Sequence, residues 1–171
     1  MKINFVGLIG GILAFISLVL PWWTLILSFN GVSTDISMYP YQISGITFST
    51  NFWYGWAALA LIIVAGILGI LASIVIERKL VLIIAGAIAL LSIIIFAVGL
   101  QMDLPQLSSE LGITDLGLFS SGSFGDLEIS WNYSAYLSLG FWLALISAII
   151  MLIAALIKEG KPAAVQPPPT A

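Results

Sequence analysis

The side chains most able to do chemistry in this chain of 171 residues are acidic, and most of them gather in two polar stretches. Carboxylate oxygens are the hard ligands that Ca²⁺ prefers, so such residues could form a cation site. Their spacing matches no cation-binding loop, and we therefore expect a solvated acidic surface without a bound metal. The residues concerned are Asp35, Asp103, Glu110, Asp115, Asp126 and Glu128.

Two residue types that carry much of protein chemistry do not occur in the sequence: there is no cysteine and no histidine. Disulfides and thiolate metal sites are therefore excluded, and the commonest general base is missing. The sequence also contains no phosphate-binding glycine loop and no nucleophile motif. We expect no catalytic residue and no cofactor, and we predict that the protein is not an enzyme.

One residue is a candidate for covalent modification. The triplet Asn132-Tyr133-Ser134 is a glycosylation sequon, in which Asn132 would be the acceptor. Such triplets also arise by chance, and this one lies close to a predicted membrane helix. Asn132 is therefore a candidate glycosylation site that needs a direct test.

Long apolar stretches make up most of the remaining chain. Hydrophobic residues account for 61% of the sequence and charged residues for 8%, and the mean hydropathy is +1.17. A soluble core of this size could not hide so much apolar surface, so lipid must surround most of it. About 20 helical residues cross the hydrocarbon layer of a membrane. We predict four spans, at about 3–21, 52–76, 80–100 and 136–157.

The charged residues sort cleanly in this topology. The outer loops, at about 22–51 and 101–135, contain no Lys or Arg, so every basic residue lies on the opposite side. Because basic residues stay on the cytoplasmic side, we predict a multi-pass plasma-membrane protein with cytoplasmic termini and two extracellular loops. Residues 1–161 would form the membrane domain, and 162–171 a flexible Pro-rich cytoplasmic tail. The basic residues are Lys2, Arg78, Lys79, Lys158 and Lys161.

The first outer loop carries the patterns of a β-sheet. Thr24–Phe29 is rich in strand-forming residues, and Asn30-Gly31 after it is a strong turn signal. Farther on, apolar residues alternate with polar neighbours, which indicates strands with one buried face. We predict a small antiparallel sheet with strands that include Ile36, Met38, Ile46 and Phe48.

The second outer loop begins with a different pattern. Residues 103–111 could form a short helix, separate from the preceding span and ended by Gly112. Two further strands are predicted at Ile113–Phe119 and Asp126–Asn132, on either side of a turn at 120–123. Both outer loops would therefore contribute to the sheet.

Two residue types indicate how the spans pack and where they end. Small residues let membrane helices approach closely, and Gly7 and Gly11 form a G-x-x-x-G pair that could also join two copies. The predicted packing positions are Gly7, Gly11, Gly66, Gly69 and Gly86. Tryptophan concentrates at membrane interfaces, so the predicted interface anchors are Trp22, Trp23, Trp53, Trp56 and Trp142.

The segment Leu20-Pro21-Trp22-Trp23, between the first span and a strand-rich loop, resembles the L-P-x-W segment of claudin-like four-helix (tetraspan) membrane proteins. The two cysteines of that family's first loop are missing, and the second loop is the longer one here. The resemblance implies a left-handed four-helix bundle capped by a small extracellular sheet, with roles in cell contact or membrane organisation. It also implies that Trp23 anchors the sheet at the lipid interface.

We therefore predict a mainly α-helical membrane protein: a four-transmembrane-helix bundle with a small extracellular β-sheet formed by two outer loops. Its expected function is structural, with lateral self-association through the helices and outer loops organising membrane or cell-surface contacts. The expected partners are membrane lipid, further copies of the chain and other membrane proteins, but not nucleic acid. An accessory non-catalytic subunit of a respiratory or transport complex is the alternative, and a passive pore lined by the loops is a third hypothesis.

Overall fold

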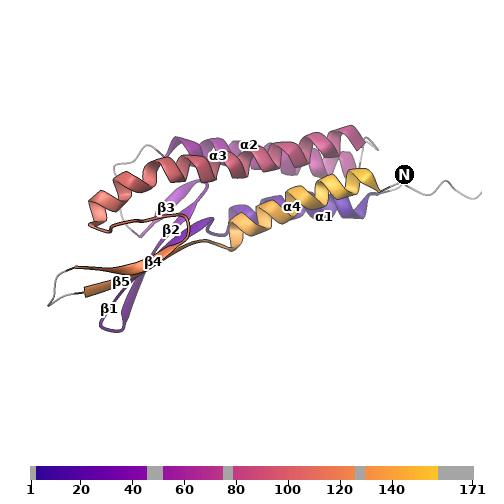
Figure 1. Ribbon diagram of the computed structural model, residues 1–171. Coiled ribbons are helices and arrows are strands. Elements are labelled where there is room, and N and C mark those ends of the chain that lie inside the picture. The colour runs from indigo at the N-terminus through magenta and orange to yellow at the C-terminus, as the bar shows by residue number, and fades with distance from the viewer. Residues whose placement is uncertain (1–2, 46–51, 75–78, 126–129, 158–171) are drawn as a thin grey trace, which may run out of the picture.

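The computed structural model describes residues 3–45, 52–74, 79–125 and 130–157. This part of the chain forms four helices and five strands, and the strands lie together at one end of the helices (Figure 1). The predicted tail at 162–171 and the predicted strand at Ile46 and Phe48 lie outside the described residues. The elements are α1 (Phe5–Leu18), β1 (Trp23–Phe29), β2 (Val32–Tyr39), β3 (Gln42–Ser44), α2 (Trp53–Ile74), α3 (Lys79–Leu111), β4 (Ser120–Gly125), β5 (Ser130–Leu137) and α4 (Leu139–Leu156).

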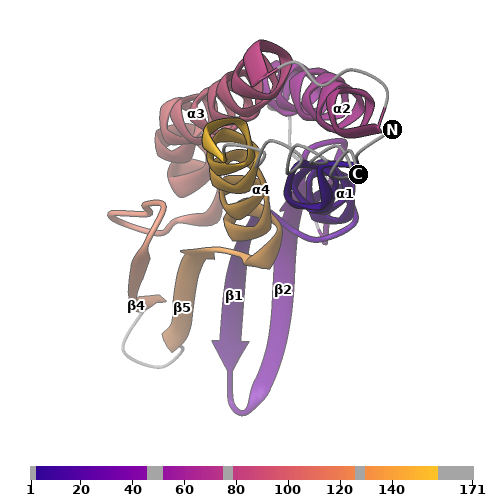
Figure 2. The same ribbon diagram turned by 90° about the vertical axis from the view of Figure 1, so that its right-hand side faces the viewer.

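The helices form a ring in which α1 and α3 each pack against both α2 and α4 (Figure 2). Glycines make these close contacts possible. A Cβ atom on Gly11 would lie 3.0 Å from the carbonyl oxygen of Gly66, and one on Gly86 would lie 3.0 Å from that of Ala148. Gly7 faces Ser73 in the same way, and Gly69 faces Met151.

All five predicted packing glycines therefore lie in contacts within the chain. Gly7 and Gly11 are buried by α2 and α3 of the same molecule. Other helices of the same molecule already cover this G-x-x-x-G face, and a contact between two copies through it stays a prediction.

Three helices, α2, α3 and α4, are long and apolar enough to cross a membrane. The first helix is shorter than the predicted span at 3–21: it has 14 residues, which reach about 21 Å. Its bounds have local causes. The side chain of Asn4 accepts a hydrogen bond from the Gly7 N–H at the start, and after Pro21 the chain enters a strand. The lengths and apolar composition of α2, α3 and α4 fit a protein embedded in a membrane.

The third helix is longer than predicted and absorbs the separate short helix expected at 103–111. It runs for 33 residues with Pro105 inside it. A proline inside a helix costs about 3 kcal/mol. Leu100, Leu104 and Leu107 are nonetheless buried along one face of this extension. Burial of a leucine contributes about 1.5–3 kcal/mol, so three of them outweigh the proline and keep the helix continuous.

The strands form one antiparallel sheet in the order β3-β2-β1-β5-β4. The predicted strand and turn in the first loop are confirmed: β1 and β2 form a hairpin at Asn30-Gly31, whose φ angles are +47° and +81°. Two successive positive φ angles define the turn whose twist matches a hairpin. Because β1 also pairs with β5, the two loops build a single sheet, as predicted.

In the second loop the predicted strand positions are wrong. Residues 120–123, expected to form a turn, lie in β4, and β5 continues past Asn132 to Leu137. The reason is a long side chain on the neighbouring strand. The Tyr133 ring would lie 2.9 Å from a Cβ atom on Gly122, so the glycine that suggested a turn instead makes room for the ring. Because β5 includes Tyr136 and Leu137, α4 begins three residues later than the predicted span at 136–157.

Candidate functional site: the hydroxyl face of the sheet

The sheet has two faces of different chemistry, because successive side chains of a strand point to opposite sides. One face, here called the apolar face, is buried. The segment between α3 and β4 lies over it: the Trp23 ring N–H donates to the Leu118 carbonyl at 3.3 Å, and the Tyr133 hydroxyl to that of Thr114 at 3.0 Å. The apolar face consists of Trp23, Leu25, Leu27, Ile36, Met38, Tyr133, Ala135 and Leu137.

The opposite face, here called the hydroxyl face, carries polar side chains on every strand. The register places Ser44, Ser37, Thr24 and Tyr136 in one row across four strands. Among the side chains that define this face, Ile26 is apolar, and it lies between Asp35 and Ser134. The hydroxyl face consists of Thr24, Ile26, Ser28, Ser33, Asp35, Ser37, Ser44, Ser121, Ser123, Asn132, Ser134 and Tyr136.

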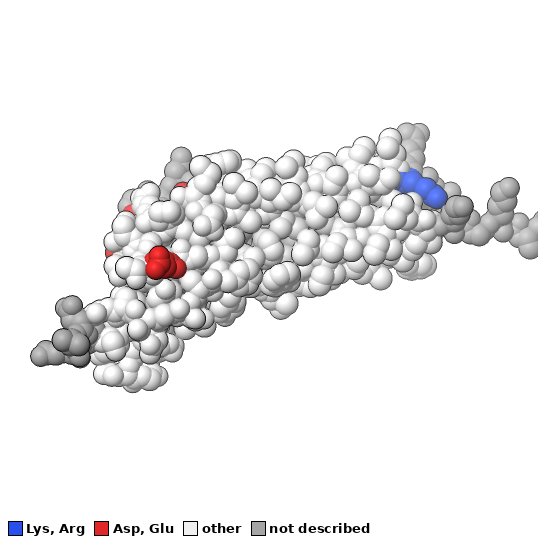
Figure 3. All heavy atoms as spheres, in the orientation of Figure 1, with Lys and Arg blue, Asp and Glu red and all other residues white. Residues whose placement is uncertain are grey.

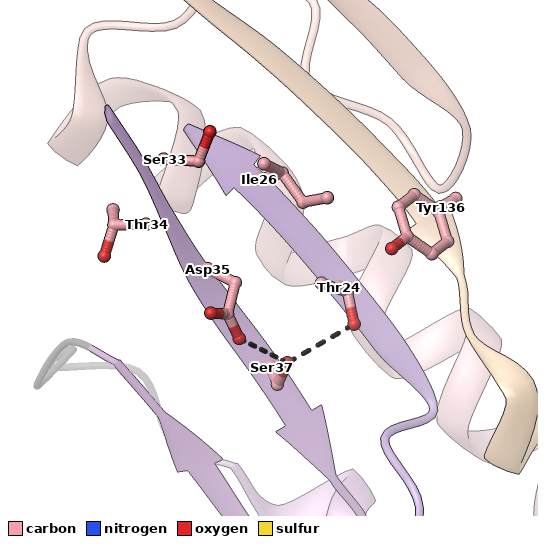
Figure 4. A pocket seen from close by; sticks show the side chains of 7 residues that line it. All are labelled: Thr24, Ile26, Ser33, Thr34, Asp35, Ser37 and Tyr136. Carbon is pink, nitrogen blue, oxygen red and sulfur yellow. Dashed lines mark hydrogen bonds between the residues drawn. The ribbon is translucent and has the colours of Figure 1, made fainter. Parts of the chain in front are cut away.

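A pocket of 390 Å³ opens on the hydroxyl face. It is lined by side chains from three neighbouring strands, and the hydroxyls of Ser37 and Thr24 point toward each other in it (Figure 4). Thr24 and Ser37 form its buried floor, whereas Asp35 and Tyr136 are exposed. The residues that line the pocket are Thr24, Ile26, Ser33, Thr34, Asp35, Ser37 and Tyr136.

A chain of hydroxyls runs from the helix bundle to the carboxylate of Asp35. The Ser138 hydroxyl donates to Thr24 Oγ1 at 2.7 Å, and the Ser37 hydroxyl donates to Asp35 Oδ2 at 3.2 Å. Thr24 Oγ1 and Ser37 Oγ are 3.4 Å apart. Because the Ser37 proton is directed to Asp35, Thr24 is the donor in this pair. All the protons of the chain therefore point toward the carboxylate.

The backbone beneath this chain ties the sheet to α4. The Ser138 N–H donates to the Trp22 carbonyl and the Gly140 N–H to the Pro21 carbonyl, both at 2.9 Å. A side chain at Gly140 would not fit, because its Cβ atom would lie 2.5 Å from the Leu20 carbonyl oxygen. The Leu20–Trp23 segment is therefore held against the first turn of α4.

This placement corrects the expectation that Trp22 and Trp23 face lipid, since both rings are fully buried. The Trp22 ring lies across the sheet end of the bundle, 5.0 Å from the Phe96 ring and 6.2 Å from the Phe141 ring. Pro21 causes the difference: it ends the helical stretch before Trp22, so the two tryptophans turn inward. Trp23 holds the sheet from its buried face, through the hydrogen bond from its ring N–H to the Leu118 carbonyl.

The three other predicted interface tryptophans, Trp53, Trp56 and Trp142, are exposed on the helix surface. The Trp142 ring N–H donates to the Leu137 carbonyl at 3.1 Å, beside the junction of β5 and α4. Their role as membrane anchors stays a prediction. Asn132 is exposed on the hydroxyl face, opposite Ser28 and Ser123, and its glycosylation likewise stays a prediction.

A second polar feature lies where α3 leaves the predicted membrane span. One carboxylate oxygen of Asp103, Oδ2, is buried and has no hydrogen-bond partner among the described residues. Burial raises the pKa of this carboxyl, and a hydrogen bond from Tyr54 partly opposes the shift. Asp103 therefore takes up a proton more readily than an ordinary aspartate.

The acidic side chains do not converge on a metal. Among the described residues, no group of three His, Cys, Asp or Glu side chains could hold an ion. Figure 3 shows acidic atoms at the sheet end of the molecule and the basic atoms of Lys79 at the other end. The predicted acids Asp126 and Glu128 lie outside the described residues.

Local sequence patterns indicate the single strands of the hydroxyl face, but they do not show that these strands lie side by side. Thr24, Ile26 and Ser28 alternate with apolar residues, and so do Asn132, Ser134 and Tyr136. Each run predicts a strand with one wet face. Only the pairing of β1 with β5 shows that the wet faces form one surface.

Comparison of the sequence with protein-family models and with curated proteins finds no match.

Proposed function

We propose that this chain is a structural membrane protein that performs no catalysis and associates with copies of itself in the membrane plane through the β4 edge of its sheet. The observation that carries this proposal is the composition of β4, an edge strand without charge or proline. Proteins usually protect an exposed edge with charges, proline, a bulge or short length. The other edge strand, β3, has only three residues and is protected by its shortness.

The outer side of β4 is available for pairing. Ser121, Gly122 and Ser123 are exposed, and within the described residues no strand other than β5 pairs with β4. A second copy could place its own β4 antiparallel to the first, about 4.8 Å away. The same patch would then serve both partners, as in a closed two-fold dimer, and the sheets of both copies would become continuous.

The arrangement of the molecule favours this contact. Viewed along the bundle, the strands extend beyond the ring of helices (Figure 2). Two copies could therefore join their sheets without overlap of their helices. The charge distribution supports the orientation: acids gather at the sheet end, and basic residues belong on the cytoplasmic side. The sheet would then be extracellular on a plasma-membrane protein, in keeping with the claudin-like resemblance.

Two other routes to function are less well supported by the packing. The small-residue faces of the helices are used inside the molecule, which leaves the sheet edge as the better surface for association. A pore through the bundle would need an open centre, but Trp22, Ala14, Phe96 and Ala144 fill it without exposure. The described parts of α2, α3 and α4 between 53 and 100 and between 139 and 156 contain no acidic residue that could serve an ion path.

The absence of cysteine makes a clean crosslinking test possible. We would make the single variants Ser121→Cys and Ser123→Cys and oxidise each in native membranes. A disulfide forms only where the Cα atoms come within about 7 Å. We expect a covalent dimer from the single variant whose cysteine lies on the two-fold axis of the β4 pair. If the axis passes at Gly122, we expect it instead from the double variant Ser121→Cys/Ser123→Cys, because position 121 of one copy then lies opposite position 123 of the other.

The matched control is Ser134→Cys, on the same face but one strand farther in, opposite Ser121. Two such cysteines would be about 14 Å apart, three strand spacings, and should not crosslink. The mass of the unmodified chain in mild detergent completes the test. Monomers together with uncrosslinked β4 variants would contradict the proposal and favour the accessory subunit of a larger complex.

A further inference from the structure

We propose that the pocket on the hydroxyl face binds the neutral sugar headgroup of a membrane glycolipid. This inference rests on the pocket and not on the β4 edge, so it stands or falls separately from the self-association proposed above. Three features carry it: the hydrogen-bonding capacity of the pocket, its charge, and its position beside the start of α4.

The floor of the pocket offers acceptors and no free donors. The Ser37 hydroxyl gives its proton to Asp35, and the Thr24 hydroxyl gives its proton to Ser37. Their remaining lone pairs, and those of the exposed Asp35 carboxylate, can only accept hydrogen bonds. A ligand that fits this floor must therefore present several donors close together, as the hydroxyls of a sugar do.

The charge of the pocket argues against a phosphate or a quaternary ammonium group as its ligand. Its single charged group is the Asp35 carboxylate. Lys79, the one basic residue in the described part of the chain, lies at the far end of the molecule (Figure 3). A phosphate would meet a carboxylate with no cation to balance it. A quaternary ammonium group is usually held by several aromatic rings, whereas Tyr136 is the only one lining this pocket.

The apolar parts of the pocket suit the remaining surface of a sugar. The Tyr136 side chain is 38% exposed and stands opposite Thr24 at one side of the pocket, and Ile26 lies between the polar residues. An aromatic ring beside polar side chains can cover the C–H face of a sugar while its hydroxyls reach the acceptors. The volume of 390 Å³ lies within the usual range of small-molecule sites, about 300–1,000 Å³.

The position of the pocket indicates that its ligand is attached to a lipid. Ser138, hydrogen-bonded to Thr24 in the pocket floor, directly precedes α4. The next residue, Leu139, is 60% exposed and opens the apolar outer surface of that helix. A headgroup in the pocket would therefore place its acyl chains along the exposed apolar surface of α4.

The test measures lipid binding to the purified full-length chain by native mass spectrometry. The detergent must have a polyoxyethylene headgroup, because a sugar-headed detergent would itself occupy the pocket. The probes are diglucosyl diacylglycerol, phosphatidylglycerol, phosphatidylethanolamine and the free disaccharide maltose. We expect diglucosyl diacylglycerol to bind at least tenfold more tightly than the other three, and dodecyl maltoside to displace it.

The key variant is Asp35→Asn, which keeps the shape of the side chain and removes the charged acceptor. Hydrogen bonds to charged groups are strong enough that we expect affinity for the glycolipid to fall about tenfold. The matched control is Asp115→Asn, an acid outside the pocket at a backbone φ of +62° that asparagine tolerates. It should bind as the unmodified chain does.

Several results would overturn the proposal. Equal binding of the glycolipid and the phospholipids would show that the pocket does not recognise sugar. An unchanged affinity in Asp35→Asn, with its thermal unfolding also unchanged, would place the sugar elsewhere. Maltose binding as tight as that of the glycolipid would rule out the membrane as the source of the ligand.

Discussion

The two faces of the sheet come from the same strands, yet they have opposite roles. On β1, Trp23 and Leu25 are fully buried beneath the segment that follows α3, while Ile26 and Ser28 on the other side remain partly open. The apolar face joins the sheet to the rest of the molecule. The hydroxyl face is attached to the bundle only at its base, through Thr24 and Ser138.

The difference shows how stability and recognition can be separated within one small sheet. Burial of the apolar face removes large side chains from water and contributes most of the free energy that holds the sheet in place. The exposed hydroxyls contribute little to folding and are free to bind. Substitutions on the two faces should therefore have distinct effects on the free energy of unfolding.

The largest effect is expected from Trp23→Ala on the apolar face. The ring is fully buried and its N–H is bound to the Leu118 carbonyl, so its loss should lower the free energy of unfolding by about 3–5 kcal/mol. The measurement is chemical or thermal unfolding of the purified chain in detergent. The control on the opposite face is Tyr136→Ala, whose ring is 38% exposed and whose loss should cost a smaller amount, about 1–2 kcal/mol. Equal losses in both variants would contradict the division between the faces.

A smaller effect is expected where the hydroxyl face meets the bundle. Thr24→Val keeps the side-chain shape but removes the group that accepts from Ser138 and donates to Ser37, and all three residues are buried. Buried polar groups left without partners should cost about 1–3 kcal/mol of stability. Ser28→Ala, which breaks an exposed hydroxyl pair with Ser33, should cost about 0.5 kcal/mol or less. A Thr24→Val variant as stable as Ser28→Ala would show that the buried chain of hydroxyls contributes nothing.

The smallest effect concerns pH and the carboxyl of Asp103. Because burial raises its pKa above the ordinary 3.8, folding favours the protonated form. The stabilisation that Asp103 contributes is fully present below its pKa in the unfolded chain. It is lost as the pH rises through its higher pKa in the folded protein. We expect Asp103→Asn to lose this part of the pH dependence, measured as the difference between the unfolding profiles of the two proteins from pH 3 upward. Parallel unfolding profiles for the two proteins would contradict a raised pKa of Asp103 in the folded state.

Local sequence patterns predict best whether each residue lies in polar or apolar surroundings. The apolar stretches at α2, α3 and α4, the alternation in β1 and β2, and the turn at Asn30-Gly31 were all visible as local patterns. Each follows from a short-range property: hydropathy, a two-residue period, or a backbone angle that glycine tolerates. Such properties depend on neighbours in the chain and can be predicted without knowledge of the fold.

Only the tertiary structure decided which apolar surfaces could be buried together. It kept α3 continuous through Pro105, made a strand of the serine- and glycine-rich segment at β4, and turned Trp22 and Trp23 inward. It also joined the polar sides of β1 and β5 into one hydroxyl face. These outcomes depend on contacts between residues far apart in the chain, whose burial energies outweigh the local preferences of proline, glycine and tryptophan.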